Sequence, residues 1–191
     1  MLTKNEARYC SEIVERMDAM RGFLNAETLA SPPDPVHWHQ FMSSLRAIQG
    51  NLSNAGSFIS TLLAKQYLVE RFGVEFDAAD KPQGAPGIDI DIRAPDGKRI
   101  VAEIKTTVPY GQADFGAQQQ KGFKKDFEKL VRSEAEHKFM LVTDSRAFSV
   151  LLKPKYMSLI PGVHIVNLVT GEHHVAEQIA PPDPSPPARG G

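Results

Sequence analysis

Hydrophobic residues recur at helical spacing through the first third of the chain, and this pattern predicts three helices. The first begins at the capping-box pattern Thr3-x-x-Glu6 and fades near residue 25. The prolines of residues 31–35 end the pattern, because proline cannot continue a helix. The next two helices are expected over about residues 36–48 and 57–72, separated by a turn cluster at residues 50–56.

After Gly73 the helical period gives way to alternation. Strands are expected at about residues 74–76, 88–93, 98–106, 139–143, 148–152 and 163–169. One long helix is expected over about residues 114–136. Its buried stripe would comprise Phe123, Phe127, Leu130 and Val131. Helices, a hairpin, a helix and further strands in this order predict an α/β fold with a mixed sheet.

The second and third predicted strands are expected to pair as an antiparallel hairpin. Residues 95–97, Pro-Asp-Gly, supply the turn, because proline suits the second position of a type I turn and glycine adopts the left-handed conformation after it. A three-residue loop pairs Ala94 with Lys98, so the numbers of paired residues sum to 192. Asp89 then lies opposite Glu103, with facing Cβ atoms about 4.5–5.5 Å apart.

Charged side chains gather on one face of this hairpin. Lys105 lies two residues beyond Glu103 and therefore projects from the same face. Asp91 shares that face, but the register sets it opposite Val101, and its diagonal of about 7–8 Å to Glu103 is long for sharing one ion. The other, apolar face would comprise Ile88, Ile90, Ala102 and Ile104.

The facing carboxylates Asp89 and Glu103 repel each other unless a cation lies between them. Mg²⁺ prefers oxygen ligands and keeps several waters in such a site, and Mn²⁺ can take its place. A bound divalent metal holds a phosphate oxygen and lowers the pKa of a water, while Lys105 can offset negative charge in the transition state. This combination favours hydrolysis of a phosphodiester.

The stretch GIDIDIRAPDGKRIVAEIKTT, residues 87–107, resembles the active-site hairpin of the PD-(D/E)xK nuclease superfamily. Members share the restriction-endonuclease-like fold, in which a helix precedes a mixed sheet with the acidic hairpin at its centre, and a second helix follows. The resemblance implies such a core, a central mixed β-sheet flanked by helices, over residues 51–178. A helical extension would occupy residues 1–50, and a disordered Pro/Gly-rich tail residues 179–191.

The resemblance also implies a role for each residue of the hairpin. Asp89 and Glu103 would be catalytic metal ligands, Ile104 would add its backbone carbonyl to the metal, and Lys105 would be the catalytic lysine. Some members carry a glutamine in the helix after the lysine. The auxiliary candidates are therefore Asp91, Gln118, Gln119 and Gln120. One departure is Ile88, which stands before the aspartate where the family motif has proline.

The net charge of −1 conceals a basic segment. Residues 118–160 carry 9 basic and 5 acidic side chains, a net of +4. Within the predicted long helix, Lys121, Lys124 and Lys125 could contact the phosphates of double-stranded DNA, which position a duplex without reading its sequence. The alternative is a solvated helix face whose lysines form salt bridges with acidic residues of the same helix.

Composition excludes several classes of protein. The single cysteine, Cys10, rules out an intramolecular disulfide and favours a reducing compartment. No stretch has the roughly 18–20 apolar residues of a membrane span, and residues 1–10 lack the apolar run of a secretory signal. No phosphate-binding GxxxxGK[ST] loop is present, so no nucleotide cofactor is expected. These features indicate a cytoplasmic protein, of prokaryotic type by the resemblance.

The sequence thus predicts a metal-dependent endodeoxyribonuclease, a small restriction endonuclease or a close relative. One active site cuts one strand, so double-strand cleavage would favour a homodimer. Two alternatives remain open. The first is a repair or recombination nuclease of the same fold that recognises DNA structure. The second is a DNA-binding or protein-interaction module that kept the fold but does not cut.

Overall fold

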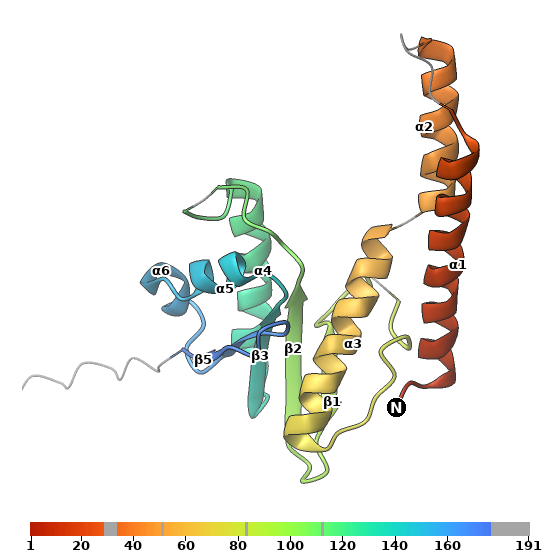
Figure 1. Cartoon of the computed structure of the whole chain (residues 1–191). Coiled ribbons are helices and arrows are strands. Elements are labelled where there is room, and N and C mark those ends of the chain that lie inside the picture. The colour runs from red at the N-terminus through yellow and green to blue at the C-terminus, as the bar shows by residue number, and fades with distance from the viewer. Residues whose placement is uncertain (29–33, 51, 83, 112, 177–191) are drawn as a thin grey trace, which may run out of the picture. The chain divides into compact units, whose positions relative to one another are not determined.

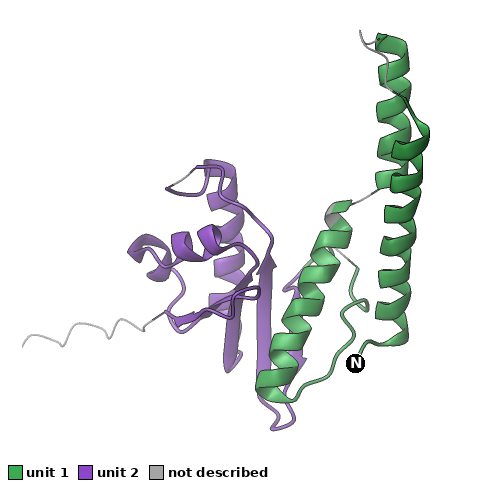
Figure 2. Ribbon diagram, in the orientation of Figure 1, with its two compact units in different colours: residues 1–86 green, residues 87–191 purple. Residues whose placement is uncertain are grey.

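The computed structural model describes residues 1–28, 34–50, 52–82, 84–111 and 113–176 (Figure 1). The chain divides into two compact units, Met1–Pro86 and Gly87–Gly191 (Figure 2). The division into an extension, a nuclease core and a tail stays a prediction, and the tail lies outside the described residues. Within the described ranges, no helix has the length and apolar composition needed to cross a membrane.

Unit 1 contains three helices, α1 (Lys4–Ala26), α2 (Pro35–Gln49) and α3 (Leu52–Phe72). The capping box is confirmed: Thr3 Oγ1 accepts from the Glu6 N–H at 3.1 Å, and the Thr3 N–H donates to Glu6 Oε2 at 2.8 Å. Asp34 caps α2 with its carboxylate, and Pro35 occupies the first turn, where its missing N–H costs nothing.

Two features expected in unit 1 are wrong. The turn cluster at residues 50–56 lies mostly within α3, because a glycine costs a helix interior only about 1 kcal/mol. The strand expected at residues 74–76 is not formed. Instead, the buried Glu6 carboxylate accepts from the Ala78 N–H at 2.7 Å and from the Lys65 ammonium at 3.0 Å. Through these hydrogen bonds, Glu6 of α1 holds the segment after α3 in place next to Lys65 of α3. Residues 74–76 therefore run alongside these helices without strand pairing.

Unit 2 is an α/β unit with a five-stranded mixed sheet flanked by helices. Its elements are β1 (Ile90–Arg93), β2 (Arg99–Lys105), α4 (Ala117–Arg132), β3 (His137–Val142), α5 (Ser145–Leu151), α6 (Pro154–Met157), β4 (His164–Asn167) and β5 (His173–Val175). The strand order is β1-β2-β3-β4-β5; β2, β3 and β4 are parallel, and the two outer strands are antiparallel to their neighbours. The predicted α/β class with a mixed sheet is confirmed.

The sheet differs from the prediction in three places. The strand expected at residues 148–152 is the helix α5, which Asp144 caps by accepting from the Ala147 N–H at 2.9 Å. The short elements α6 and β5 were not predicted. The acidic hairpin, expected at the centre of the sheet, lies at its edge, because among the described residues β1 pairs with β2 alone.

The main core of unit 2 lies between α4 and one face of the sheet (Figure 1). From the predicted stripe, the buried residues are Phe123, Phe127 and Leu130. Val131 is 41% exposed, contrary to the prediction, because one residue turns a helix by about 100°. Both strands of the hairpin were expected to alternate between buried and exposed residues. This alternation is found in β1, whereas residues 100–103 of β2 are all buried. Strand β2 is buried as a strand covered on both faces would be.

Candidate active site

The register of the hairpin is the one predicted. The four paired positions run from Ile90↔Ala102 to Arg93↔Arg99, so paired numbers sum to 192. The Ala94 N–H donates to the Lys98 carbonyl at 2.8 Å, which closes a three-residue loop. Within this loop Gly97 has a φ of 86°, a conformation that favours glycine. The turn chemistry therefore fixes which residues of the two strands face each other.

Asp89 lies one residue before β1, at the position opposite Glu103. Its Oδ2 atom accepts a hydrogen bond from the Ile104 N–H at 2.8 Å. The N–H and C=O of one strand residue point to the same side of the strand, so the Ile104 carbonyl also faces the side of Asp89. Ile88 packs against the core beside α4, so the alternation predicted for this strand begins only at Ile90.

Asp91 is held away from this group by a salt bridge within the hairpin. The Arg99 guanidinium donates to the two carboxylate oxygens of Asp91 at 2.8 and 2.7 Å. Such a bidentate pair fixes the direction of both side chains. Asp91 is therefore engaged with Arg99, and the structure associates Asp89, not Asp91, with the backbone beside Glu103.

Glu103 and Lys105 both meet side chains of α4. The Lys129 ammonium lies 2.9 Å from Glu103 Oε1, 2.9 Å from Asp126 Oδ1 and 3.0 Å from the Gly87 carbonyl oxygen. The Lys105 ammonium forms an ion pair with Asp126 Oδ2. Glu103 is 2% exposed and Asp126 is 5% exposed. Two buried carboxylates and two ammoniums thus form one network between β2 and α4.

The sequence pointed to Glu103 and Lys105 as site residues, and it assigned neither Asp126 nor Lys129 to the site. A signal for Asp126 was present. Asp126 lies three residues after Phe123 and four before Leu130, so it falls within the apolar stripe of α4. A charged residue in a buried stripe requires a partner, and Lys105 and Lys129 are those partners.

The network itself has two carboxylates and two ammoniums, and Asp89 adds a third negative charge beside it. Burial raises the pKa of Glu103 to about 8, and the negative charges of Asp89 and Asp126 contribute to the rise against the hydrogen bond from Lys129. Burial works to lower the pKa of Lys129, but its hydrogen bonds to Glu103 and Asp126 outweigh burial and raise it overall. Lys129 therefore remains an ammonium, and Glu103 is the carboxyl group that takes up a proton as the pH falls below about 8.

In chelator above pH 8, Glu103→Gln is expected to unfold at a higher temperature than the wild type, whereas near pH 5 the two should unfold alike. The folded wild type holds the Glu103 proton between the ordinary pKa and about 8, so its free energy of unfolding falls as pH rises through that window. Glutamine removes this loss and leaves two carboxylates with two ammoniums. We expect a gain of about 2 kcal/mol, or roughly 4–8 °C.

Scanning calorimetry at the two pH values measures this difference, with Asp91→Asn as the control outside the network. If Glu103→Gln instead lost the same stability at both pH values, the prediction would be contradicted, because Lys129 would then need the negative charge of Glu103 as its partner.

The glutamines of the predicted auxiliary group have mostly structural contacts. Gln119 Oε1 accepts from the Gly116 N–H at 3.0 Å, and its Nε2 donates to the Val108 carbonyl at 2.8 Å. Gln120 Nε2 donates to the Phe115 carbonyl at 2.7 Å. These bonds hold the loop between β2 and α4. Gln118 is exposed, and so are the predicted DNA contacts Lys121, Lys124 and Lys125.

The oxygen atoms of the hairpin match the ligand chemistry of a hard divalent cation. Asp89, Glu103 and the Ile104 carbonyl offer the donor type that Mg²⁺ prefers. Across the described residues, no three acidic, histidine or cysteine side chains converge as a ligand set. Glu103 and Asp126 converge instead on the Lys129 ammonium, which supplies the positive charge between them. The donor set fits a cation, with Lys129 as the group that competes for Glu103.

Comparison with protein-family models, with curated proteins and with solved structures gave no match to this chain.

Proposed function

We propose that the protein is a Mg²⁺-dependent endodeoxyribonuclease that hydrolyses phosphodiester bonds of double-stranded DNA, as the PD-(D/E)xK resemblance implies. The observation that carries the proposal is the hairpin register. It brings the Asp89 carboxylate to the backbone of Ile104, opposite Glu103, with Lys105 two residues farther along the same strand. A sequence-specific restriction enzyme acting as a homodimer is the form we favour, because each site would cut one strand.

Asp89, Glu103 and the Ile104 carbonyl would hold the Mg²⁺, and Mn²⁺ would substitute for it. When bound, the metal would polarise the phosphate and supply an activated water. Lys105 would stabilise the negative charge that develops on the phosphate. Asp126 would position Lys105, since their ion pair fixes the direction of the ammonium on β2. Lys129 would offset the charge of Glu103 and Asp126 before the metal arrives.

One observation favours a second candidate, a DNA-binding module that does not cut. Lys129 already bonds to Glu103 and Asp126, so the buried carboxylates have a cationic partner without a metal. A protein that lost catalysis could keep this network for stability alone. The Asp89 carboxylate lies outside the network, beside the Ile104 backbone, where together with Glu103 it offers the oxygen ligands that Mg²⁺ prefers, and this arrangement favours the nuclease.

Incubation of supercoiled plasmid DNA with the protein and Mg²⁺ tests the proposal. Discrete linear fragments would support a sequence-specific nuclease. Cleavage confined to branched DNA would support the structure-specific alternative of the same fold. Retained DNA binding without cleavage of either substrate, in Mg²⁺ or Mn²⁺, would instead support the non-cutting module.

Charge reversal at Lys121 and Lys125 together is expected to weaken binding to all duplex sequences. Both lysines are exposed on α4, and each phosphate that a lysine no longer neutralises should lower the salt-dependence slope by about 1. Fluorescence anisotropy of a labelled duplex at several salt concentrations, in chelator, measures both effects. The matched control is the double reversal of Lys4 and Arg8 on α1. If the control weakens binding as much, net charge rather than the α4 face is responsible.

A further inference from the structure

We propose that unit 2 contains a second phosphate-binding site, a pocket beside α5. The inference rests on the proposed function in one respect: the phosphate would belong to the DNA backbone near the cleaved bond. The pocket has a volume of about 330 Å³, and its lining residues are Ala113, Ser145, Arg146, Ser149, Val150 and Lys153. This volume lies at the small end of the range for ligand sites, which suits a phosphate with its sugar.

The lining of the pocket is chemically suited to an anion. It includes two cationic side chains and two hydroxyls, and none of the six residues is acidic. Arg146 and Ser149 lie three residues apart on α5, a spacing that brings their side chains to one face of the helix, and Lys153 follows α5 as the residue before α6. An arginine guanidinium can donate two parallel hydrogen bonds to a phosphate, and the Ser145 hydroxyl can donate to another of its oxygens. The Ser149 hydroxyl already donates to the Ser145 carbonyl at 2.9 Å, so it lines the pocket as an acceptor.

Arg146 and Lys153 have only weak or neutral partners among the described residues. The Arg146 Nε lies 3.8 Å from Asp144 Oδ1, and the Arg146 side chain is 60% exposed, so this pair contributes little. The same Asp144 oxygen accepts the capping hydrogen bond from the Ala147 N–H. The Lys153 ammonium donates to the Ala113 carbonyl, which is a neutral acceptor. Within the described part of the chain, the carboxylate paired with Arg146 is the distant Asp144, and the Lys153 contact is to a neutral carbonyl.

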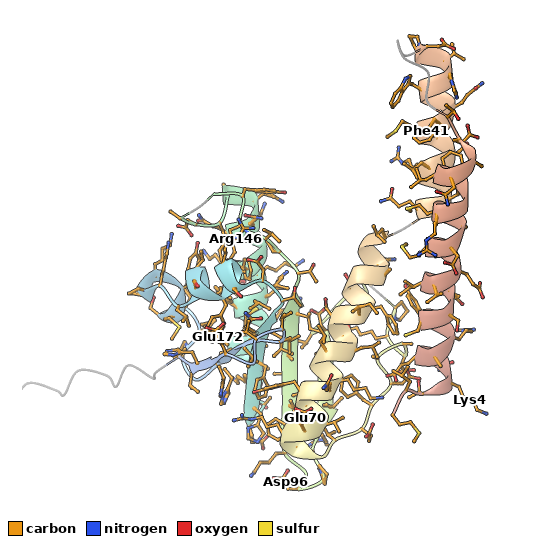
Figure 3. The ribbon with its side chains drawn as sticks, viewed as in Figure 1. Lys4, Phe41, Glu70, Asp96, Arg146 and Glu172 are labelled. Atoms are coloured by element: carbon orange, nitrogen blue, oxygen red, sulfur yellow. The ribbon has the colours of Figure 1, made fainter. Side chains whose placement is uncertain are left out.

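The pocket lies at the end of the sheet where β2 ends with Lys105. Strands β2 and β3 are parallel, so their carboxyl ends meet at one edge, and the pocket is built from the segments that follow them. Thr143 lies two residues before the pocket residue Ser145, and its N–H donates to the Lys105 carbonyl at 3.3 Å. This hydrogen bond places the start of the pocket next to the backbone of Lys105. Figure 3 shows Arg146 toward this edge and Asp96, in the hairpin turn, at the opposite end of the sheet.

A buried amide anchors Ser145, one of the residues that line the pocket. Asn167, at the end of β4, is fully buried, and its Nδ2 donates to Ser145 Oγ at 3.0 Å. Its Oδ1 accepts from the Val169 N–H at 3.1 Å. The first residue of α5 is therefore anchored to the sheet, and a phosphate bound beside it would be held at a fixed place relative to Lys105.

The test compares Arg146→Glu with Lys98→Glu, which reverses a charge at the hairpin turn. Binding of a short labelled DNA duplex is measured in chelator, where nothing is cut, and binding of inorganic pyrophosphate is measured by calorimetry. Arg146→Glu is expected to weaken duplex binding roughly tenfold and to lower the salt slope by about 1, and it should also abolish pyrophosphate binding. Lys98→Glu should change neither.

The outcomes separate the pocket from the proposed function. If the wild type binds no duplex, the nuclease proposal fails, and the pocket is judged on pyrophosphate alone. Pyrophosphate binding that Arg146→Glu abolishes, with duplex binding unchanged, would support a phosphate site for a free nucleotide and overturn its role in DNA binding. Unchanged binding of both probes by Arg146→Glu would overturn the pocket altogether.

Discussion

Asp89→Asn is expected to lower the rate of Mg²⁺-dependent DNA cleavage roughly a hundredfold or more, whereas Asp91→Asn should retain most of it. Asp89 lies opposite Glu103 and bonds to the Ile104 backbone, where the metal would be held. Asp91 is bound to the Arg99 guanidinium and contributes a partly exposed ion pair. Rates on one DNA substrate, measured under single-turnover conditions, distinguish the two variants.

The comparison is informative because the two aspartates share their side-chain chemistry and lie two residues apart on one strand. They differ in register and therefore in the residues that they face. An active Asp89→Asn enzyme beside an inactive Asp91→Asn enzyme would show that Asp91 is the ligand. That result would contradict the assignment of Asp89 to the metal while leaving a nuclease function open.

Lys105→Ala should also remove most cleavage, by roughly a hundredfold to a thousandfold, while DNA binding and thermal stability change little. The lysine would act on charge that develops in the transition state, so its removal should affect the rate more than the ground state. Asp126 keeps its second partner, Lys129, and is therefore not left as an unpaired buried carboxylate. Rate, duplex affinity and unfolding temperature are measured together.

Lys105→Arg is the matched variant, because it keeps the charge and changes the shape. It should recover part of the rate. A purely structural lysine would give a different pattern: Lys105→Ala would lose stability and affinity in proportion to activity, and Lys105→Arg would restore all three.

The hairpin could be predicted from sequence because its determinants are local. The alternation of Ile90 and Ile92 with charged residues and the Pro-Asp-Gly turn lie within a few residues of one another. Together they fix the loop length, and the loop length fixes the register. The capping box of α1 is local in the same sense, and it too is confirmed.

The two strands that were wrong have different causes, one local and one tertiary. Residues 148–152 are a short apolar run, and such a run does not distinguish a strand from a buried helix. The carboxylate of Asp144 decides the outcome by capping α5. By contrast, residues 74–76 have strand-like composition, but the backbone of nearby Ala78 donates to the Glu6 carboxylate, which lies 72 residues away in the chain.

The candidate site shows the same limit. Asp89, Glu103 and Lys105 follow from one hairpin, whereas Asp126 and Lys129 join them only through the packing of α4 on β2. Lys129 is 26 residues from Glu103, and the rotation of α4 about its axis decides which of its lysines turns inward. Helical periodicity indicates the buried stripe but does not show which strand residue an inward-facing charge will meet.

Calorimetric titration with Mn²⁺, in the absence of DNA, tests the central claim most directly, because it needs no knowledge of the recognition sequence. Wild type and Asp91→Asn should bind Mn²⁺ with the same affinity. Asp89→Asn and Glu103→Gln should bind at least about tenfold more weakly, since each removes one anionic oxygen ligand. A wild-type protein that binds no Mn²⁺, or equal affinities across all four proteins, would contradict the assignment of Asp89 and Glu103 as a metal-binding pair.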